Sequence, residues 1–287
     1  MKSLWLTLLA LAALSACEDK QFGEPMTLGG KLVPAEALNR GFASYRRNCT
    51  GCHGKQGDGD APTAKSMKPR PRDFTLGYFK FKSVPGDGLP TDEDLLQTVR
   101  RGLRGTHMPS WANLPDADLL ATLQYIKTFS PRWGEHKVGQ PVPHPSDPWT
   151  GNRLEAVKRG EVVYHATAGC WECHPAYVPR SQLVALRAQE KIEKPPLRDH
   201  LQRSRPVKTR YGPLTAPDYL SDPLKVAWEP ALLYRTVAAG VGGTPMPSWH
   251  GRLAPRDLWA VVHYIQHLIQ IKGTPEAKTL REQMIGP

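Results

Sequence analysis

The chain has 287 residues, and its lysines and arginines outnumber its acidic residues by 38 to 27, which gives a formal charge of +11. This length predicts two units of ordinary domain size. No segment after the N-terminus is long and apolar enough to span a bilayer, which requires about 20 residues. The basic balance favours acidic partners or anionic lipid headgroups. We expect no nucleic-acid partner, because the N-terminus predicts export and no binding module is present.

The N-terminus predicts a signal peptide with a lipid anchor. Lys2 precedes an apolar run from Leu4 to Leu14 that is too short to cross a membrane and fits a signal-peptide core. The run ends in Leu14-Ser15-Ala16-Cys17, which resembles the lipobox of bacterial lipoproteins, in which the cysteine is lipidated. We therefore predict a signal peptide over residues 1–16, lipidation at Cys17 and a tether over residues 17–34. An ordinary signal peptide with an incidental cysteine is the alternative, and export follows from both.

Two short stretches carry the strongest chemical signal. Cys49-Thr50-Gly51-Cys52-His53 and Cys170-Trp171-Glu172-Cys173-His174 share the C-x-x-C-H spacing that is typical of a covalently held haem. Two cysteines at this spacing can form thioethers to both vinyl groups of one porphyrin, and the adjacent histidine reaches the iron. The fifth cysteine is Cys17, so none remains for a structural disulfide. We predict two haem c groups.

A zinc knuckle and a thioredoxin-like redox pair are the alternatives for this spacing. A zinc site needs a fourth ligand close to each motif. A thioredoxin-like pair needs a βαβ context, which is absent from the sequence. The two motifs therefore favour haem.

The predicted elements around both motifs are helices. A helix from Ala35 to Asn48 leads into the first motif, and residues from Leu154 to Thr167 take the same place before the second. Long alternating strand patterns are absent. We therefore predict an all-α fold with long loops, because a porphyrin supplies core that a short chain cannot build for itself.

The two halves of the chain repeat. The block Gly105-Thr106-His107-Met108-Pro109-Ser110-Trp111 matches Gly243-Thr244-Pro245-Met246-Pro247-Ser248-Trp249 at six of seven positions. Each block lies between two predicted helices, and the second of these helices begins near Pro115-Asp116 in one copy and near Pro255 in the other. This repetition predicts two copies of one fold.

Met108 and Met246 are the candidate second ligands of the two irons. Each is followed by proline, which biases it away from helix and stiffens its loop. An iron that only passes electrons needs a sixth ligand, and a thioether raises its reduction potential. A core-filling role is the alternative for both methionines. His107 is a competing candidate for the second iron ligand in the first half only, because its counterpart in the second half is Pro245. We interpret His107 as exposed or facing a haem propionate.

Composition divides the chain into segments. Residues 131–153 are rich in proline and glycine and predict a semi-rigid, extended linker. Domain 1 then covers residues 35–130, domain 2 covers 154–270, and 271–287 form a C-terminal tail. The motif histidine and the methionine are 72 residues apart in domain 2 and 55 in domain 1, and the longer stretch includes a basic segment, 180–210. This segment could dock a partner, but a solvated surface is the interpretation that we favour.

Together these features resemble a dihaem member of the class I c-type cytochromes, over nearly the whole mature body. In domain 1 the motif continues into Gly57-Asp58-Gly59-Asp60, similar to the glycine-rich turn of that family, whereas Pro175-Ala176-Tyr177 departs from it in domain 2. The resemblance implies helices around each haem and electron transfer as the activity. It also implies attachment at Cys49, Cys52, Cys170 and Cys173, proximal ligands His53 and His174, and distal ligands Met108 and Met246.

The function predicted from the sequence is electron transfer between redox protein partners. The protein would be tethered on the periplasmic side of a bacterial membrane, as a carrier or as a subunit of a respiratory oxidoreductase complex. The alternative is an enzyme of the dihaem cytochrome c peroxidase type, which needs one iron with an open distal site. Because each copy brings its own methionine, the sequence favours electron transfer. A haem-based sensor would need a signalling module, which is absent.

Overall fold

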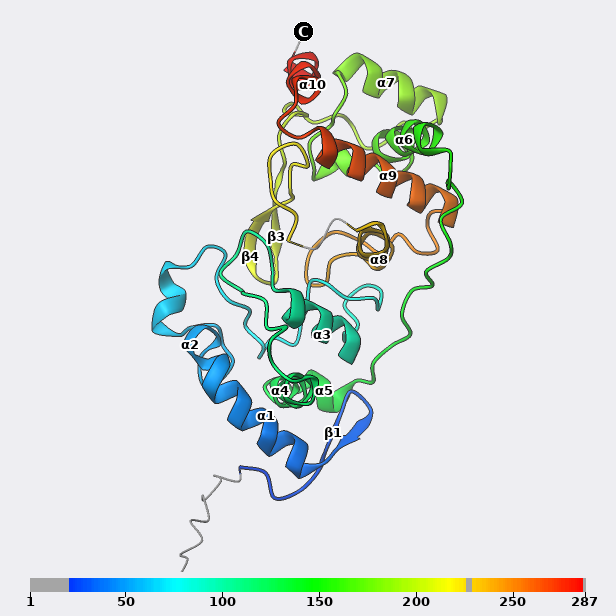
Figure 1. The fold of residues 1–287 in the computed structure, drawn as a ribbon. Helices are drawn as coiled ribbons and strands as arrows, with labels where there is room; N and C mark the ends of the chain where they lie inside the picture. Colours follow the sequence, from blue (N-terminus) through cyan, green and yellow to red (C-terminus); the bar gives the residue numbers. More distant parts are fainter. Residues whose placement is uncertain (1–20, 226–228, 286–287) are drawn as a thin grey trace, which may run out of the picture.

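The structure of the protein is a computed structural model that describes residues 21–225 and 229–285. Cys17 and the predicted signal peptide lie outside the described residues. Within those two ranges, none of the helices combines the length and the apolar character that a membrane crossing requires. Figure 1 shows two lobes, with α1 to α5 in one and α6 to α10 in the other.

The first lobe contains the elements of domain 1. In chain order they are β1 (Met26–Leu28), β2 (Lys31–Val33), α1 (Ala35–Asn48), α2 (Thr50–His53), the 3₁₀ helix η1 (Pro62–Ser66), α3 (Asp92–Arg101), α4 (Asp116–Lys127) and α5 (Arg132–Glu135). The predicted helix from Ala35 to Asn48 is confirmed at both ends, and α4 begins at the predicted Asp116.

The second lobe repeats this order with additions. It contains α6 (Arg153–Val162), the π-helix η2 (Val163–Thr167), the 3₁₀ helix η3 (Cys170–Glu172), α7 (Arg180–Gln189), β3 (Pro206–Thr209), β4 (Gly212–Thr215), α8 (Pro230–Ala239), α9 (Pro255–Ile271) and α10 (Pro275–Ile285). The helix that precedes each C-x-x-C-H motif packs on the helix that follows each methionine block, so α1 packs on α4 and α6 packs on α9.

A glycine brings each of these helix pairs close together. A Cβ atom on Gly41 would lie 2.0 Å from the carbonyl oxygen of Ala121, and a Cβ on Gly160 would lie 2.0 Å from that of Ala260. Both glycines lie inside helices, where glycine costs about 1 kcal/mol relative to alanine. Only glycine permits this backbone approach, so the helix crossing explains both residues.

Each lobe has its own hydrophobic core. The core of domain 1 includes Leu38, Tyr45, Leu119 and Leu123, and the larger core of domain 2 is built around α6, α8 and α9. A third, small cluster joins Trp171 to Leu183 of α7 and Leu201. This third cluster belongs to the segment by which domain 2 exceeds domain 1, so that segment is packed structure.

The prediction of an all-α fold is too narrow, because the structure also has two short antiparallel hairpins. In the first, Gly29 and Gly30 form the turn with φ of 63° and 84°, as a tight two-residue hairpin turn requires. Leu28 and Val33 of this hairpin are buried in the core of domain 1. Strands of three or four residues are too short for an alternating pattern to be recognised in the sequence.

The segment predicted as a linker packs against both domains. Trp133 of α5 is completely buried in the core of domain 1, and Trp149 is buried in the core of domain 2. Between them, the N–H of Val142 donates to the carbonyl oxygen of Ser83 (2.8 Å). The predicted tail contains α10, whose Ala277 and Met284 are buried. Both segments therefore contribute packed residues, which their proline and charge content did not predict.

The two domains contact each other through main-chain and charged groups. The N–H of Gly86 donates to the carbonyl oxygen of Ala239 (3.2 Å), and the N–H of Gly242 donates to that of Lys80 (3.2 Å). Arg235 of α8 lies 3.2 Å from Asp94 of α3, and the Asp94 side chain is only 2% exposed. The hydrogen bonds join loops of the two domains, and the ion pair joins α8 to α3. The domains are therefore packed against each other.

Candidate functional site

The two C-x-x-C-H motifs fold into the same tight turn. In domain 1 the N–H groups of Cys52 and His53 both donate to the carbonyl oxygen of Cys49, at 3.2 and 2.9 Å. The N–H groups of Cys173 and His174 donate to the carbonyl oxygen of Cys170 at the same two distances. The structure thus brings both thiols and the imidazole of each motif into one turn, and all four cysteines are free.

Both motif histidines are held by a carbonyl oxygen. The Nδ1–H of His53 donates to the carbonyl oxygen of Arg72 (3.0 Å), and that of His174 donates to the carbonyl oxygen of Pro217 (3.0 Å). A carbonyl oxygen can only accept, so each ring carries its proton on Nδ1 and leaves the Nε2 lone pair for a metal. Burial lowers the pKa of both imidazoles, which keeps them neutral, as a ligand must be.

An aromatic ring stacks on each of these imidazoles. The ring of Phe74 lies 4.5 Å from that of His53, and the ring of Tyr219 lies 5.2 Å from that of His174. Together with the carbonyl hydrogen bond, this stacking fixes the plane of the imidazole. The orientation of a ligand that must meet an iron on one side is therefore set before any metal binds.

The first thiol of each motif is shielded from solvent. Burial, together with the second thiol of the same motif, raises the pKa of Cys49 and of Cys170 to about 12. Zinc binds thiolates, and a zinc knuckle needs four ligands. Among residues 21–225 and 229–285 no group of three His, Cys, Asp or Glu side chains is arranged to hold a metal ion. The donor set therefore does not fit the zinc alternative.

The two methionine blocks have the same hydrogen bonds. The Oγ1 of Thr106 accepts from the N–H of Met108 (3.1 Å), and the Oγ1 of Thr244 accepts from the N–H of Met246 (3.2 Å). Both threonine hydroxyls also donate to the carbonyl oxygen three residues earlier, at 2.7 Å in each copy. The repeated threonine therefore fixes the backbone of the repeated methionine, and both methionines are half-buried.

A glycine begins each methionine loop. Gly102 ends α3 with φ of 68°, and a Cβ there would lie 2.7 Å from the carbonyl oxygen of Met108. Gly240 ends α8 with φ of 78°, and a Cβ there would lie 2.8 Å from that of Met246. The left-handed conformation and the close approach both require glycine. His107 is exposed on this loop in domain 1.

Arg198 holds the attachment turn of domain 2. Its Nε–H donates to the carbonyl oxygen of Trp171 (2.8 Å), and its Nη2–H donates to that of His174 (2.7 Å). Arg187 of the same basic segment is buried, donates to the carbonyl oxygen of Pro195 and lies over the Trp171 ring. The interpretation of 180–210 as a solvated surface is therefore wrong for these two arginines. Their carbonyl partners are distant in sequence, so the sequence alone could not reveal them.

His165 is a further residue whose role the sequence did not reveal. It is fully buried in the π-helix η2, where its Nδ1–H donates to the carbonyl oxygen of Glu161 (2.8 Å). Its Nε2 accepts from the N–H of Tyr177 (3.0 Å), and its own carbonyl oxygen accepts from Nε1–H of Trp171 (2.8 Å). His165 thereby ties α6 to both sides of the second attachment turn. A single histidine on an apolar helix face gave no signal of this in the sequence.

The domain interface reaches the first attachment site through Arg72. Its carbonyl oxygen accepts from His53, and its guanidinium lies 3.6 Å from the ring centre of Tyr211, in the β3–β4 turn of domain 2. The hydroxyl of Tyr211 donates to the carbonyl oxygen of Gly242 (3.0 Å), in the loop that leads to Met246. A chain of direct contacts therefore joins the proximal side of site 1 to the methionine loop of site 2.

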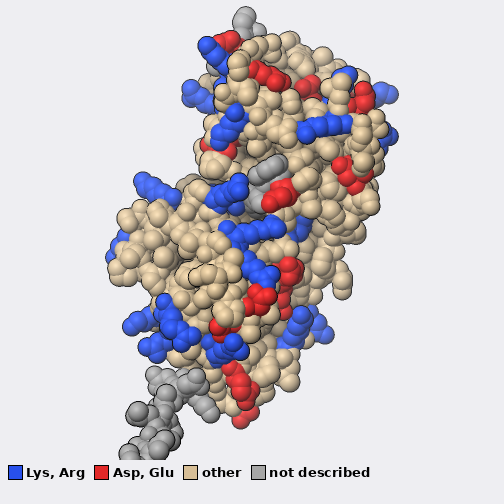
Figure 2. Space-filling model, in the orientation of Figure 1, with Lys and Arg blue, Asp and Glu red and all other residues tan. Residues whose placement is uncertain are grey.

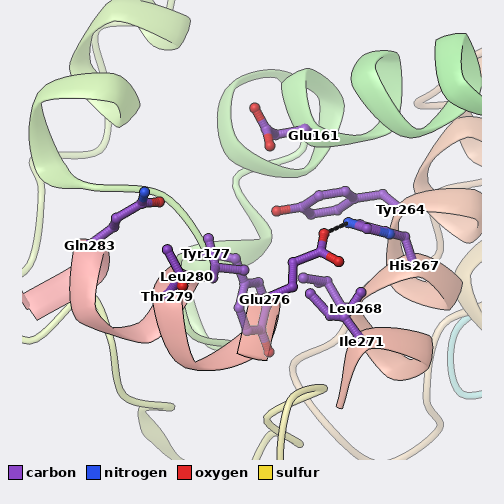
Figure 3. Close-up of a pocket in the computed structure, with 10 residues that line it drawn as sticks. All are labelled: Glu161, Tyr177, Tyr264, His267, Leu268, Ile271, Glu276, Thr279, Leu280 and Gln283. Atoms are coloured by element: carbon purple, nitrogen blue, oxygen red, sulfur yellow. Dashed lines mark ion pairs between the residues drawn. The ribbon is translucent and has the colours of Figure 1, made fainter. Parts of the chain in front are cut away.

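A surface pocket of about 420 Å³ lies elsewhere on domain 2, between α9 and α10. Figure 3 shows His267 and Glu276 pointing toward each other across it, 3.5 Å apart, with the rings of Tyr264 and Tyr177 in its wall. None of the motif cysteines, motif histidines or repeated methionines lines this pocket. This pocket is therefore separate from the two attachment turns.

The comparisons with known proteins agree with this geometry. The sequence profile of the family "cytochrome c oxidase, cbb3-type, subunit III" matches residues 36–126 and again residues 155–265. The chain belongs to this family. The double match shows two tandem cytochrome c domains of the cbb3-type subunit III family, and no curated protein matches the chain.

A solved structure resembles most of this chain. It is a chain of the reducing HAO-like protein complex of Kuenenia stuttgartiensis, which is 28% identical. The match covers 80% of this chain and 96% of that chain, with a TM-score of 0.66. Because cytochrome c domains of the cbb3-type subunit III family bind haem c covalently, this protein has a haem electron-transfer role.

The residues present fit such a haem. Each motif offers two thiols for thioethers and a neutral imidazole whose Nδ1 is occupied by a carbonyl oxygen. Bound haem supplies a one-electron couple of its iron. The chain itself orients the imidazole, fixes the methionine loop and surrounds the site with buried aromatic rings, which lower the local dielectric.

Proposed function

We propose that this protein is an exported dihaem electron-transfer protein that works between redox partners, as part of an oxidoreductase complex. One haem c would be attached through Cys49 and Cys52, with His53 and Met108 as its axial ligands. The other would be attached through Cys170 and Cys173, with His174 and Met246. The observation that carries this proposal is the repetition, hydrogen bond for hydrogen bond, of the same histidine anchor and the same methionine loop in both domains.

The same repetition favours electron transfer over a peroxidase. An enzyme of that type needs one domain whose distal side opens to substrate. Here both methionine loops begin at a glycine that fits against the methionine carbonyl, and both are held by a threonine. Similarity to a chain of a complex from Kuenenia stuttgartiensis supports a role within an assembly. We further propose that lipidation at Cys17 tethers the protein on the periplasmic side of a membrane.

Replacing either methionine by leucine tests the axial ligands. In the oxidised holoprotein, Met108→Leu and Met246→Leu are each expected to remove about half of the weak absorption band near the red end of the spectrum, because one of two thioether–iron bonds is lost. The reduction potential of the altered site is expected to fall, since a thioether raises it. Spectroelectrochemistry that resolves both haems measures both changes.

Met67→Leu is the matched control, because Met67 is a half-buried methionine outside the repeated block. It is expected to leave the band and both potentials unchanged. If Met108→Leu and Met246→Leu behave like this control, the methionines are not ligands. Sustained turnover of hydrogen peroxide by the unaltered holoprotein would identify the peroxidase alternative instead.

A further inference from the structure

The surface over the attachment turn differs between the two domains. Between the cysteines of domain 1, Gly51 is exposed and Thr50 is half-buried. In domain 2 the counterpart of Thr50 is Trp171, which is only 1% exposed, and the counterpart of Gly51 is Glu172, which is half-buried. Because thioether bonds hold one edge of a haem at the cysteines, the cover over this turn determines how near a partner protein can come.

Domain 2 covers its turn with the segment that domain 1 lacks. Trp171 packs in the small core with Leu183 of α7 and Leu201. Arg198 binds two carbonyl oxygens of the turn, and the N–H of Arg205 donates to the carbonyl oxygen of Cys173 (2.9 Å). Residues 180–205 therefore pack on the attachment turn of domain 2. A partner protein would stay further from the haem of domain 2 than from the haem of domain 1.

The segment of domain 1 that contains its attachment turn carries exposed positive charge. Residues 46–70, which we name the basic face, contain six cationic side chains and two carboxylates, all exposed: Arg46, Arg47, Lys55, Lys65, Lys68, Arg70, Asp58 and Asp60. The α2 and η1 helices of this face contact each other, and the Thr63 hydroxyl donates to the carbonyl oxygen of Gly51. Figure 2 shows Lys and Arg side chains along the edge of the lower lobe that carries α1 and α2 in Figure 1.

Three lysines of this face have no carboxylate partner within the described residues. Arg70 pairs with Asp60 at 3.0 Å. Within the described part of the chain, no ion pair involves Lys55, Lys65 or Lys68. Exposed cations around a redox site steer an oppositely charged partner toward it and raise the rate of encounter. The large exposed apolar side chains of the described residues lie outside 46–70, so the face lacks the apolar residues with which a protein enters a membrane surface.

We propose that the basic face docks an acidic redox protein and that electrons enter or leave the chain through the haem of domain 1. This inference rests on the proposed function. In each exchange, one electron passes between the partner's redox centre and the iron of domain 1, so that one is oxidised as the other is reduced, and no bond is formed or broken. The haem of domain 2 then exchanges electrons with the exterior mainly through domain 1.

Charge reversal on the two surfaces tests this. The probe is ferricyanide, a trianionic one-electron oxidant, mixed with the reduced full-length holoprotein. Lys55→Glu/Lys65→Glu/Lys68→Glu is expected to lower the bimolecular rate constant roughly tenfold at about 10 mM salt, and much less at about 1 M salt, where charges are screened. With tris(phenanthroline)cobalt(III), a cationic oxidant, the same variant is expected to react faster.

Lys194→Glu/Arg203→Glu/Lys208→Glu is the matched control, because it reverses three exposed charges of the basic segment 180–210. Its rate with ferricyanide is expected to stay within about twofold of the unaltered protein. A larger effect of this control, or equal effects of both variants, would overturn the proposal. Each single reversal in domain 1 is expected to give part of the effect, which keeps the test usable if the triple variant folds poorly.

Two further outcomes are informative. If reversal on the basic face weakens binding to phosphatidylglycerol vesicles but leaves the ferricyanide rate unchanged, the face meets a membrane and the docking proposal is wrong. If the holoprotein cannot be reduced and reoxidised at all, the proposed function has failed. If the holoprotein is redox-active but neither triple charge reversal changes its rate constant with ferricyanide, only the docking proposal is contradicted.

Discussion

Gly160→Ala is expected to destabilise domain 2 by about 3 kcal/mol or more, which is the upper part of the range for overpacked cores. The new Cβ would lie 2.0 Å from the carbonyl oxygen of Ala260 and 2.7 Å from Cβ of Tyr264, so α6 and α9 must separate. Gly41→Ala is expected to do the same to domain 1, because its Cβ would lie 2.0 Å from the carbonyl oxygen of Ala121. Denaturation of the holoprotein by guanidinium chloride measures both changes.

Gly134→Ala is the control for glycine replacement in a helix. Gly134 lies in α5, and a Cβ there would meet no atom within 4 Å. The free energy of unfolding of this variant is expected to rise by up to about 1 kcal/mol, because alanine has a higher helix propensity than glycine. If Gly41→Ala and Gly160→Ala also gain stability, the two helix pairs do not approach as closely as the structure has them.

Acid is expected to destabilise domain 2 through His165. Burial lowers the pKa of this imidazole to about 4, from an ordinary value near 6.5. The unfolded chain therefore binds a proton below pH 6.5, while the folded chain stays neutral until about pH 4. The stability that depends on neutral His165 is fully present above pH 6.5, and up to about 3 kcal/mol of it is lost between pH 6.5 and pH 4.

A variant without the titrating group isolates this effect. His165→Gln is expected to be less stable than the unaltered protein at pH 7, because hydrogen bonds to Glu161 and Tyr177 are weakened. Between pH 6.5 and pH 4 its free energy of unfolding is expected to fall less steeply, while other titrating groups affect both proteins alike. Parallel curves for the two proteins would show that His165 is not neutral and buried in the folded state.

Local patterns predicted the parts of this protein that depend on neighbours in sequence. The helix from Ala35 to Asn48, the start of α4 and the repeated methionine block all follow from spacing and from proline. The C-x-x-C-H turn is also local, since its hydrogen bonds close onto its own first cysteine. The sequence therefore predicted a helical protein with two tandem cytochrome c domains, which the family match supports.

Contacts between residues that are distant in the chain could not be predicted from the sequence. The carbonyl oxygens that hold His53 and His174 lie 19 and 43 residues further along the chain, and a backbone carbonyl leaves no trace in residue identity. Arg198 looked like one cation in a charged segment, because its 27-residue separation from Trp171 is visible only after folding. The hairpins were missed because strands of three and four residues show no periodicity, although Gly29-Gly30 is a recognisable turn signal.

The amount of covalent haem on the purified, full-length protein shows whether each domain carries its own haem. Iron analysis together with intact-mass measurement is expected to find two haems and two irons per chain, because both domains have the same pair of thiols and the same anchored imidazole. Cys49→Ala/Cys52→Ala and Cys170→Ala/Cys173→Ala are each expected to retain one. A single haem per unaltered chain, or haem that is removed by acid and organic solvent, would contradict covalent attachment of one haem in each domain.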